Sequence, residues 1–296
     1  MPEPTPFPLP VPSPCHARPV LVAVAHGSRD PRAGEVLDHL VHRMRSLAPD
    51  TDVRLSYVDH TRPSISQALD AVAEQASSAV VLPLLLSAAS HSKGDIPGSI
   101  AAARTRHRGL TVSYGRVLGP HPLLIDALQQ RLTDSGVELD SALVLASAGS
   151  ADPESNAEVA KVARLLWEVR PGGPVEVGFA SATTPTVSHA LSRLRRLGYE
   201  QIAVAAYFLA PGQFLDGVKA AAIGPAGVAA ADTVTVTEPL ADTDAVARLV
   251  LDRYAEALAG QARMNCDCCM YRAPWPGHEQ RVGQHQVPHA HPAERR

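Results

Sequence analysis

The chain has 296 residues, 45% of them hydrophobic, which is enough for one large domain or two ordinary domains with a sizeable core. Such a composition excludes a wholly disordered protein. Its 27 lysine and arginine residues are nearly balanced by 30 aspartate and glutamate residues, for a net charge of −3. The basic excess typical of nucleic-acid-binding proteins is therefore absent, and we expect no nucleic-acid partner.

The sequence indicates neither a membrane-spanning stretch nor a secretory signal. Its most apolar run, residues 79–86, is short and is interrupted by Pro83. The N-terminus lacks the basic and apolar regions of a signal peptide. The chain has four cysteines, three of them within residues 266–269, which are too few to stabilise a fold of this size by disulfide bonds. We therefore expect no membrane partner and a reducing, cytoplasmic location.

The two ends of the chain differ from its middle. Proline occupies every even position from Pro2 to Pro14, which favours extended polyproline II, so residues 1–17 are predicted to be a disordered leader. Residues 263–296 mix Cys, His, Pro and Gly without helical or strand periodicity, and we expect an irregular tail there. The regular middle divides into two predicted lobes, residues 18–138 and 139–262.

The first half alternates short apolar strands with amphipathic helices. Each helix begins near a proline, which suits a first helical turn because the N–H there has no partner in the helix. The predicted strands span 20–25, 53–58, 79–86 and 111–117, and the helices begin near Pro31, Pro63, Pro97 and Pro122. Apolar strands separated by helices predict a parallel sheet with helices on both faces.

The second half repeats this alternation. Its predicted strands span 144–147, 175–180 and 202–209, with helices beginning near Pro153, Pro185 and Gln213. Individual residues align as well: segment 26–31 (HGSRDP) matches 148–153 (AGSADP), and 61–63 (TRP) matches 183–185 (TTP), both at an offset of 122 residues. The sequence therefore predicts an α/β fold of two duplicated lobes, each with a four-stranded parallel sheet, and a boundary near residues 136–141.

Three side chains that can bind a metal or accept a proton follow strands of the first half. His26 ends the first strand, Asp59 follows the second, and His91 lies just past the third. The carboxyl ends of parallel strands meet at one edge of a sheet, where ligands of open α/β folds bind. Two imidazoles and a carboxylate suit a divalent first-row metal, and they also suit proton abstraction near neutral pH.

The second half lacks these groups. Its corresponding positions are Ala148, Ser181 and, at an offset of 123 residues from His91, Phe214. None of the three is a comparable ligand or base. The pattern therefore indicates one working site and one copy that has lost its site.

Other interpretations remain open at the level of the sequence. A histidine at a strand end is often a hydrogen-bonded loop residue, and Asp59 could serve only to form a turn. The Gly27-Ser28 pair could bind phosphate at a helix N-terminus, although neither nucleotide-binding glycine motif is present. Six other histidines are interpreted as surface or structural residues: His39, His42, His60, His107, His121 and His189.

Three segments of the first half resemble the sirohydrochlorin chelatases of the CbiX/SirB type. They are residues 24–29 (VAHGSR), residues 84–97, which include LLLSAASH and DIP, and residues 58–65 (VDHTRPSI). In the last segment that family usually has Glu at the position of Asp59, and Asp shortens the reach of the carboxylate by one methylene. The resemblance covers about residues 19–259, which include both halves.

This resemblance implies the chelatase fold, with two lobes that face an active-site cleft, and a metal chelatase that inserts Co²⁺ or Fe²⁺ into sirohydrochlorin. Such an enzyme serves cobalamin or sirohaem biosynthesis, although a chelatase for another tetrapyrrole is a weaker alternative. By carry-over, His26 and His91 are the catalytic and metal-binding histidines and Asp59 is the accompanying carboxylate. Because the duplicated halves supply both lobes, we expect a monomer or a homodimer.

The residue types suit metal insertion, which displaces two protons from pyrrole nitrogens. His26 and His91 are predicted to guide the ion and accept these protons, with Asp59 orienting an imidazole or sharing the metal. Because sirohydrochlorin is a polycarboxylate, cationic and hydroxyl groups near the site are predicted to bind it. These substrate-binding candidates are Ser28, Arg29, Arg62, Ser90, Ser92 and Lys93.

The tail carries a second group of potential ligands. Residues 264–269 (MNCDCC) match M-x-C-x-x-C, which resembles the motif linked to an iron–sulfur cluster in long-form CbiX proteins. Cys266, Cys268 and Cys269 are the candidate ligands, with a fourth from Cys15, a histidine or a partner chain. The alternative is an oxidation-prone thiol cluster or a metal delivery site. With such a site the chain would be a non-catalytic metal-binding protein or metallochaperone.

Overall fold

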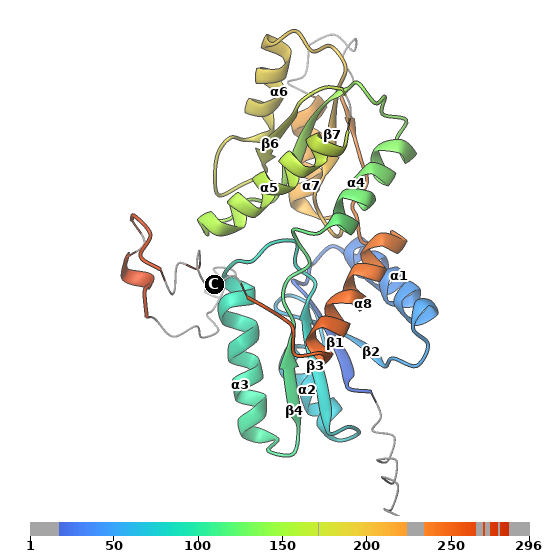
Figure 1. The fold of residues 1–296 in the computed structure, drawn as a ribbon, viewed down its shortest axis with the longest axis vertical. Helices are drawn as coiled ribbons and strands as arrows, with labels where there is room; N and C mark the ends of the chain where they lie inside the picture. Colours follow the sequence, from blue (N-terminus) through green and yellow to red (C-terminus); the bar gives the residue numbers. More distant parts are fainter. Residues whose placement is uncertain are drawn as a thin grey trace, which may run out of the picture.

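The computed structural model describes residues 18–170, 172–223, 234–264, 269, 273–277 and 279–283, and this part of the chain contains two parallel sheets flanked by helices (Figure 1). The predicted leader, residues 1–17, lies outside the described residues, as does most of the tail. The two sheets lie toward opposite ends of an elongated molecule. Among the described helices, none is long and apolar enough to cross a membrane.

The first sheet has the strand order β2-β1-β3-β4, with every pair parallel. Its strands are β1 (Val20–Ala25), β2 (Val53–Tyr57), β3 (Ser78–Pro83) and β4 (Thr111–Tyr114). The helices are α1 (Pro31–Leu47), α2 (Ile65–Ala73), the π-helical turn η1 (His91–Asp95), α3 (Ile96–Arg106) and α4 (Pro122–Asp134). In β1, Leu21 and Ala23 face one hydrophobic cluster and Val22 and Val24 face another, so both faces of the sheet are buried.

The second sheet repeats this order as β6-β5-β7-β8, again with every pair parallel. Its strands are β5 (Ala142–Ser147), β6 (Val175–Phe179), β7 (Ile202–Ala206) and β8 (Thr235–Val236). The helices are α5 (Pro153–Val169), α6 (Val187–Arg196), α7 (Gln213–Ile223), α8 (Asp244–Leu258) and, in the tail, the short 3-10 turn η2 (Glu279–Arg281). The predicted duplicated α/β fold is confirmed, and β8 completes the second sheet although it is too short to give a strand pattern.

The third strand is shorter than predicted. It ends at Pro83, where residues 79–86 are all apolar apart from the proline and predict a longer strand. Past Pro83 the backbone leaves the sheet, because the carbonyl oxygens of Leu85 and Leu86 accept hydrogen bonds from the Leu118 N–H (2.9 Å) and the Tyr207 hydroxyl (3.2 Å). Residues 84–89 form instead the loop that leads to the helical turn of His91.

The second helix of each half begins after its proline. Pro63 lies outside α2, and Ser64 is the N-cap: its Oγ accepts from the N–H of Gln67, and its own N–H donates to Oε1 of Gln67. Thr186 has the same role at the start of α6. These reciprocal bonds satisfy two backbone N–H groups at the start of each helix that have no partner within the helix.

The duplication extends to the backbone of the loops at the carboxyl edges of the sheets. Gly27 and Gly149 both have a positive φ, 94° and 83°. A side chain at Gly27 would collide with the carbonyl oxygen of Asp59 at 1.7 Å, and one at Gly149 with that of Ser181 at 2.1 Å. Both positions therefore require glycine, because only glycine combines this φ with so close an approach.

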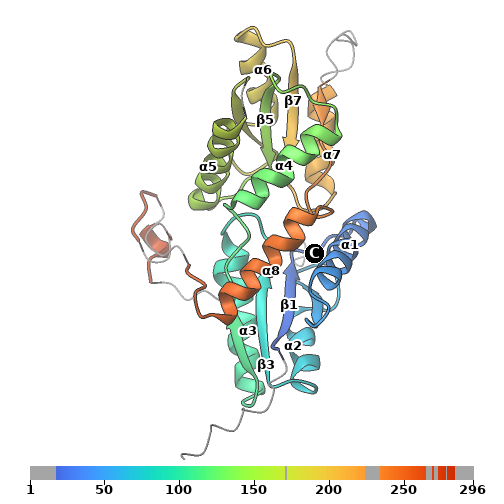
Figure 2. The same ribbon diagram turned by 45° about the vertical axis from the view of Figure 1, so that its right-hand side comes forward.

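The two lobes exchange their last helices. Helix α4 packs against β7 and α5 of the second lobe, and α8 crosses back to pack against α1, β3 and β4 of the first (Figure 2). Arg131 of α4 donates to two backbone carbonyls of the second lobe at 2.8 and 2.9 Å. The fully buried Arg253 of α8 donates to the carbonyls of Val117 (3.1 Å) and Leu118 (2.8 Å) in the first lobe. One hydrophobic cluster consequently runs through both lobes.

Candidate active site

His26 and His91 lie together at the carboxyl edge of the first sheet. His26 directly follows β1 and His91 opens η1 beyond β3, and these two strands are neighbours in the sheet. The ring centroids are 4.7 Å apart and the rings meet edge to face at 80°. His26 is exposed and the side chain of His91 is 17% exposed, so the pair is open to a ligand from outside.

The Nδ1 atom of each imidazole lies within hydrogen-bonding distance of an acceptor oxygen. His26 Nδ1 lies 3.1 Å from the carbonyl oxygen of Gly27. His91 Nδ1 lies 2.5 Å from Oδ2 of Asp95, whose side chain is only 6% exposed. A neutral imidazole that donates from Nδ1 carries its lone pair on Nε2, and a carboxylate partner of this kind fixes the orientation of metal-binding histidines. The Nε2 atoms are thus the candidate ligand and base atoms of the pair.

Asp59 is turned toward His60. Its Oδ1 accepts from the N–H of His60 at 2.7 Å, and its Oδ2 lies 3.2 Å from His60 Nε2, outside hydrogen-bonding geometry. The His60 ring is in turn 6.4 Å from the His26 ring. Within the described residues, no group of three His, Cys, Asp or Glu side chains is arranged to hold a metal ion. The structure thus pairs His26 with His91, and a place for Asp59 in the ligand set stays a prediction.

The predicted substrate-binding residues of the first two loops lie near this edge. Both the backbone and the side chain of Ser28 form hydrogen bonds. Its N–H donates to Oγ1 of Thr61 in the loop after β2 (3.1 Å), and its Oγ accepts from the N–H of Asp30 (3.0 Å). Arg29 and Arg62 are both exposed. Their guanidinium groups are therefore accessible to an anion that approaches these two loops.

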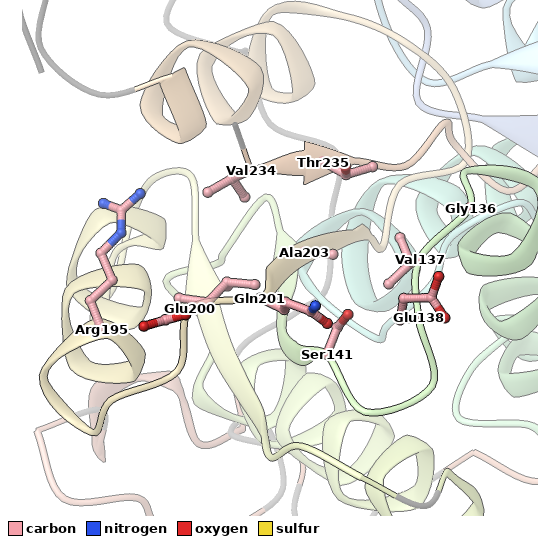
Figure 3. Close-up of a pocket in the computed structure, with 11 residues that line it drawn as sticks. Gly136, Val137, Glu138, Ser141, Arg195, Glu200, Gln201, Ala203, Val234 and Thr235 are labelled. Atoms are coloured by element: carbon pink, nitrogen blue, oxygen red, sulfur yellow. The ribbon is translucent and has the colours of Figure 1, made fainter. Parts of the chain in front are cut away.

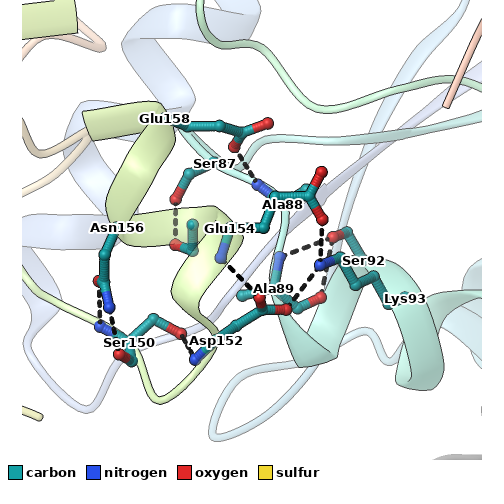
Figure 4. A network of polar contacts seen from close by, with 11 residues as sticks. Ser87, Ala88, Ala89, Ser92, Lys93, Ser150, Asp152, Glu154, Asn156 and Glu158 are labelled. Carbon is teal, nitrogen blue, oxygen red and sulfur yellow. Dashed lines mark hydrogen bonds and ion pairs between the residues drawn. The ribbon is translucent and has the colours of Figure 1, made fainter. Parts of the chain in front are cut away.

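The predicted substrate-binding residues of the third loop are placed differently. Ser90 is half-buried ahead of η1, while the buried Ser92 closes a turn with the backbone of Ala89. Lys93 is 8% exposed, and its Nζ lies 2.6 Å from both Oδ2 of Asp152 and Oε2 of Glu154 in the second lobe (Figure 4). The turn of η1 directs Lys93 into the second lobe, where its ammonium pairs with these carboxylates, and its role in substrate binding stays a prediction.

Further contacts join the loop before His91 to the second lobe. Ser87 Oγ lies 2.7 Å from Oγ of Ser155, and the N–H of Ala88 donates to Oε2 of Glu158 at 2.7 Å (Figure 4). Burial raises the pKa of Glu158 to about 7, and the bond from Ala88 only partly offsets this.

In the described part of the second lobe, the corresponding edge of the sheet holds no such pair of bases. The Ser181 hydroxyl, in the loop after β6, donates to the carbonyl oxygen of Ala148, in the loop after β5, at 2.9 Å. Phe214, at the position that matches His91, is 42% exposed in the first turn of α7. Of the two equivalent edges, only the first brings imidazoles together in the part of the chain that the structure describes.

A pocket of about 230 Å³ lies elsewhere in the second lobe (Figure 3). It opens at the amino ends of β7 and β8, near Gln201 and Thr235, and is also lined by Glu138 beyond α4. None of the predicted site residues lines it. Because α/β folds bind ligands at the carboxyl ends of their strands, we assign it no part in the site.

The tail cysteines fall mostly beyond the described residues. Cys266 and Cys268 lie outside them, and Cys269 is buried and forms no disulfide. The predicted cluster of three thiolates therefore stays a prediction.

Two residues near the pair were not singled out from the sequence. Asp95 lies four residues after His91, a spacing that brings side chains together on a helix and that could have revealed this partner. His60 was interpreted as a surface or structural residue, yet its ring lies 6.4 Å from the ring of His26 and its Nε2 lies 3.2 Å from Oδ2 of Asp59. Its positive φ of 59° turns the ring there, and a sequence gives little sign of that conformation.

Comparison with known proteins relates both halves of the chain to one family. The CbiX family model matches residues 20–135 and 142–257. A sirohydrochlorin cobaltochelatase from Priestia megaterium is 30% identical over 273 residues, which are 87% of this chain and 86% of that protein. A sirohydrochlorin ferrochelatase from the same organism is 27% identical over 199 residues, 66% of this chain and 75% of that protein.

Two solved structures are also similar to this chain over both of its halves. SirB from Bacillus subtilis with Fe³⁺ is 25% identical, with a TM-score of 0.69 over 83% of this chain and 99% of that one. The sirohydrochlorin chelatase SirB from Bacillus subtilis subspecies spizizenii, in complex with cobalt, has the same identity and coverage and a TM-score of 0.65. The similarity in structure thus spans both lobes.

Proposed function

This chain belongs to the CbiX family, and from that premise we propose that it is a sirohydrochlorin chelatase, a lyase that inserts Co²⁺ or Fe²⁺ into the macrocycle. The observation that carries the proposal is the contact between His26 and His91, whose rings are 4.7 Å apart at the carboxyl edge of the first sheet. The relatives named for cobalt and for iron both support a divalent first-row metal as the substrate ion.

The reaction exchanges one divalent ion for two pyrrole protons, so the site must hold the ion loosely and take up protons. The Nε2 atoms of His26 and His91 bind the incoming ion and leave its other coordination positions to water and the macrocycle. A closed set of four protein ligands would retain the ion instead. As the ion passes to the pyrrole nitrogens, the imidazoles accept the displaced protons and release them to solvent. Asp95 holds the His91 ring in the tautomer that this step requires.

The remaining rim residues have supporting roles in this proposal. Asp59 keeps His60 beside His26. Arg29 and Arg62 pair with carboxylates of the substrate, since an exposed guanidinium binds a carboxylate in bidentate fashion. Ser28 and Ser90 donate hydrogen bonds from the same rim.

The test is anaerobic spectrophotometry of sirohydrochlorin with Co²⁺ and, separately, with Fe²⁺. Each metal is measured without protein, with the wild type and with the double variant His26→Ala/His91→Ala, because the macrocycle takes up metal unaided. We expect the wild type alone to accelerate metal insertion, and the faster metal indicates cobalamin or sirohaem biosynthesis. A double variant as fast as the wild type would contradict the proposal.

We also propose that the tail binds an iron–sulfur cluster through Cys266, Cys268 and Cys269. The supporting observation is that Cys269 is buried and not in a disulfide, and thiolates are the usual ligands of such clusters. Iron and sulfide analysis after anaerobic purification, compared with the triple Cys→Ser variant, tests this. Deleting residues 263–296 should remove the cluster and leave substantial turnover, whereas a metallochaperone acting through the tail would lose its activity.

The cytoplasmic location and the assembly state remain predictions. Because α4 and α8 already join two lobes within one chain, a monomer needs no second chain to complete the fold. Light scattering of the purified protein distinguishes the monomer from the homodimer. A cytoplasmic location fits an enzyme whose tail thiols would be oxidised outside the cell.

A further inference from the structure

We propose that the second lobe, which lacks a site of its own, positions His91 for the reaction through the ion cluster of Lys93, Asp152 and Glu154. The inference rests on the proposed chelatase function, because it assigns a positioning role to residues that touch neither ion nor macrocycle. It also gives the degenerate copy a reason to be retained.

The ion cluster lies close to His91 and is almost completely buried. Lys93 follows His91 by two residues within η1, and its side chain is 8% exposed. The carboxylates of Asp152 and Glu154 are 7% and 3% exposed, and each lies 2.6 Å from the ammonium. A buried charge that lost such partners would be strongly destabilised, so the cluster allows η1 very little freedom to move.

The loop that precedes His91 also forms hydrogen bonds with the second lobe. Ser87 contacts Ser155, Ala88 donates to Glu158, and the carbonyl of Leu86 accepts from the hydroxyl of Tyr207. All three partners belong to the second lobe. The segment from Leu86 to Lys93 is therefore anchored to the second lobe on both sides of His91.

A second ion pair between the lobes, Arg32 with Asp216, can be compared with the Lys93 cluster. At the offset of the repeat, Asp216 matches Lys93 and Arg32 matches Glu154. Arg32 pairs with Asp216 across the lobes at 2.7 Å, so the same contact exists with the charges reversed. There, however, the side chains are 54% and 48% exposed, and exposed pairs contribute little. The buried version lies on the side that carries His91.

The consequence for catalysis is geometric. His91 must keep its Nε2 aimed at the place where His26 meets the ion, and a displacement of about 1 Å lowers turnover by up to about a hundredfold. A residue that only positions His91 changes kcat. A residue that binds a substrate carboxylate, as the sequence predicted for Lys93, changes KM for sirohydrochlorin instead.

The test compares four variants with the wild type. Lys93→Met/Glu154→Gln, the neutral double variant, removes both charges of the Lys93–Glu154 pair with little change of volume and leaves the Asp152 carboxylate as the cap of α5. Lys93→Arg keeps the charge. Lys93→Asp/Glu154→Arg copies the arrangement of Asp216 and Arg32 onto the His91 side. Asp216→Asn breaks the exposed pair and is the matched control. Each protein is measured by kcat and KM of anaerobic metal insertion and by hydrogen exchange of residues 84–95.

We expect the neutral double variant to lose about tenfold to a hundredfold in kcat with KM unchanged, and its loop to exchange at least about tenfold faster. Lys93→Arg, the charge-exchanged double variant and Asp216→Asn should stay near the wild type. Wild-type kcat in the neutral double variant, a raised KM alone, or no recovery on charge exchange would overturn the inference. A wild type without turnover would contradict the proposed function, and the loop exchange would then still support or overturn the role of the cluster.

Discussion

At the scale of single residues, Asp95 is the group on which the state of His91 depends most directly. Its Oδ2 lies 2.5 Å from His91 Nδ1, and the side chain is almost completely buried. Such a partner both orients the ring and selects the tautomer with its lone pair on Nε2. The Nδ1 of His26 lies 3.1 Å from the Gly27 carbonyl oxygen, an exposed contact with an uncharged acceptor.

Replacing Asp95 tests this dependence. Asp95→Asn keeps the volume but allows the amide to donate to Nδ1, which would move the proton to Nε2. We expect kcat for metal insertion to fall about tenfold to a hundredfold with KM for sirohydrochlorin unchanged. Asp70→Asn is the matched control, because Asp70 also pairs with a histidine, His107 at 2.6 Å, but away from the site. Equal rates for the two variants would contradict the role of Asp95.

Glu158 makes stability depend on pH. Burial raises its pKa to about 7, so the folded state favours the protonated carboxyl. Its favourable contribution, present below the unfolded value of about 4.5, is lost as the pH rises through 7. Glu158→Gln should therefore be more stable than the wild type at about pH 8, by about 1 to 3 kcal/mol, and nearly equal to it at about pH 4. Thermal unfolding at both pH values measures this, and a difference that does not change with pH would contradict it.

At the scale of elements, the sequence predicts the regular parts well and the loops less well. The strands and the repeat follow from apolar runs and from the matched segments 26–31 and 148–153. The end of β3 at Pro83 was not predictable, because the loop leaves the sheet for hydrogen bonds with residues far along the chain, such as Tyr207. The burial of Lys93 was missed for the same reason, since its partners belong to the other lobe.

The two loop glycines separate stability from function. Gly27→Ala and Gly149→Ala should each cost at least about 2 kcal/mol, because both residues have positive φ and closely approach a carbonyl oxygen. Gly27→Ala displaces a histidine of the site directly, whereas the loop of Gly149 reaches the site only through Asp152 and Glu154, so Gly27→Ala should lower kcat of the folded fraction more. Urea unfolding and turnover measure the two effects. A larger loss of kcat in Gly149→Ala than in Gly27→Ala would contradict the assignment of the site to the first lobe.

At the scale of the whole molecule, the exchange of α4 and α8 makes the lobes interdependent. Each helix is amphipathic, and that pattern predicts one buried face without indicating which sheet covers it. The boundary near residues 136–141 therefore separates the sheets but not the helices that cover them. The shared hydrophobic cluster implies that both lobes unfold together.

Substitution of Arg253 tests whether the two lobes unfold together. Arg253→Met leaves the buried carbonyls of Val117 and Leu118 without their donors, so we expect a loss of about 2 to 4 kcal/mol in a single transition. Arg248→Met, on the exposed face of the same helix, should change stability by less than about 0.5 kcal/mol. Two separate transitions in calorimetry would show that the lobes are independent.

The central claim is that His26 and His91 receive the metal ion. The most direct test is anomalous diffraction at the cobalt edge from crystals of the full chain soaked with Co²⁺. We predict a peak about 2.0 to 2.2 Å from Nε2 of both His26 and His91, with further coordination positions left to water. A well-occupied peak elsewhere, with none at these two histidines, would contradict the claim.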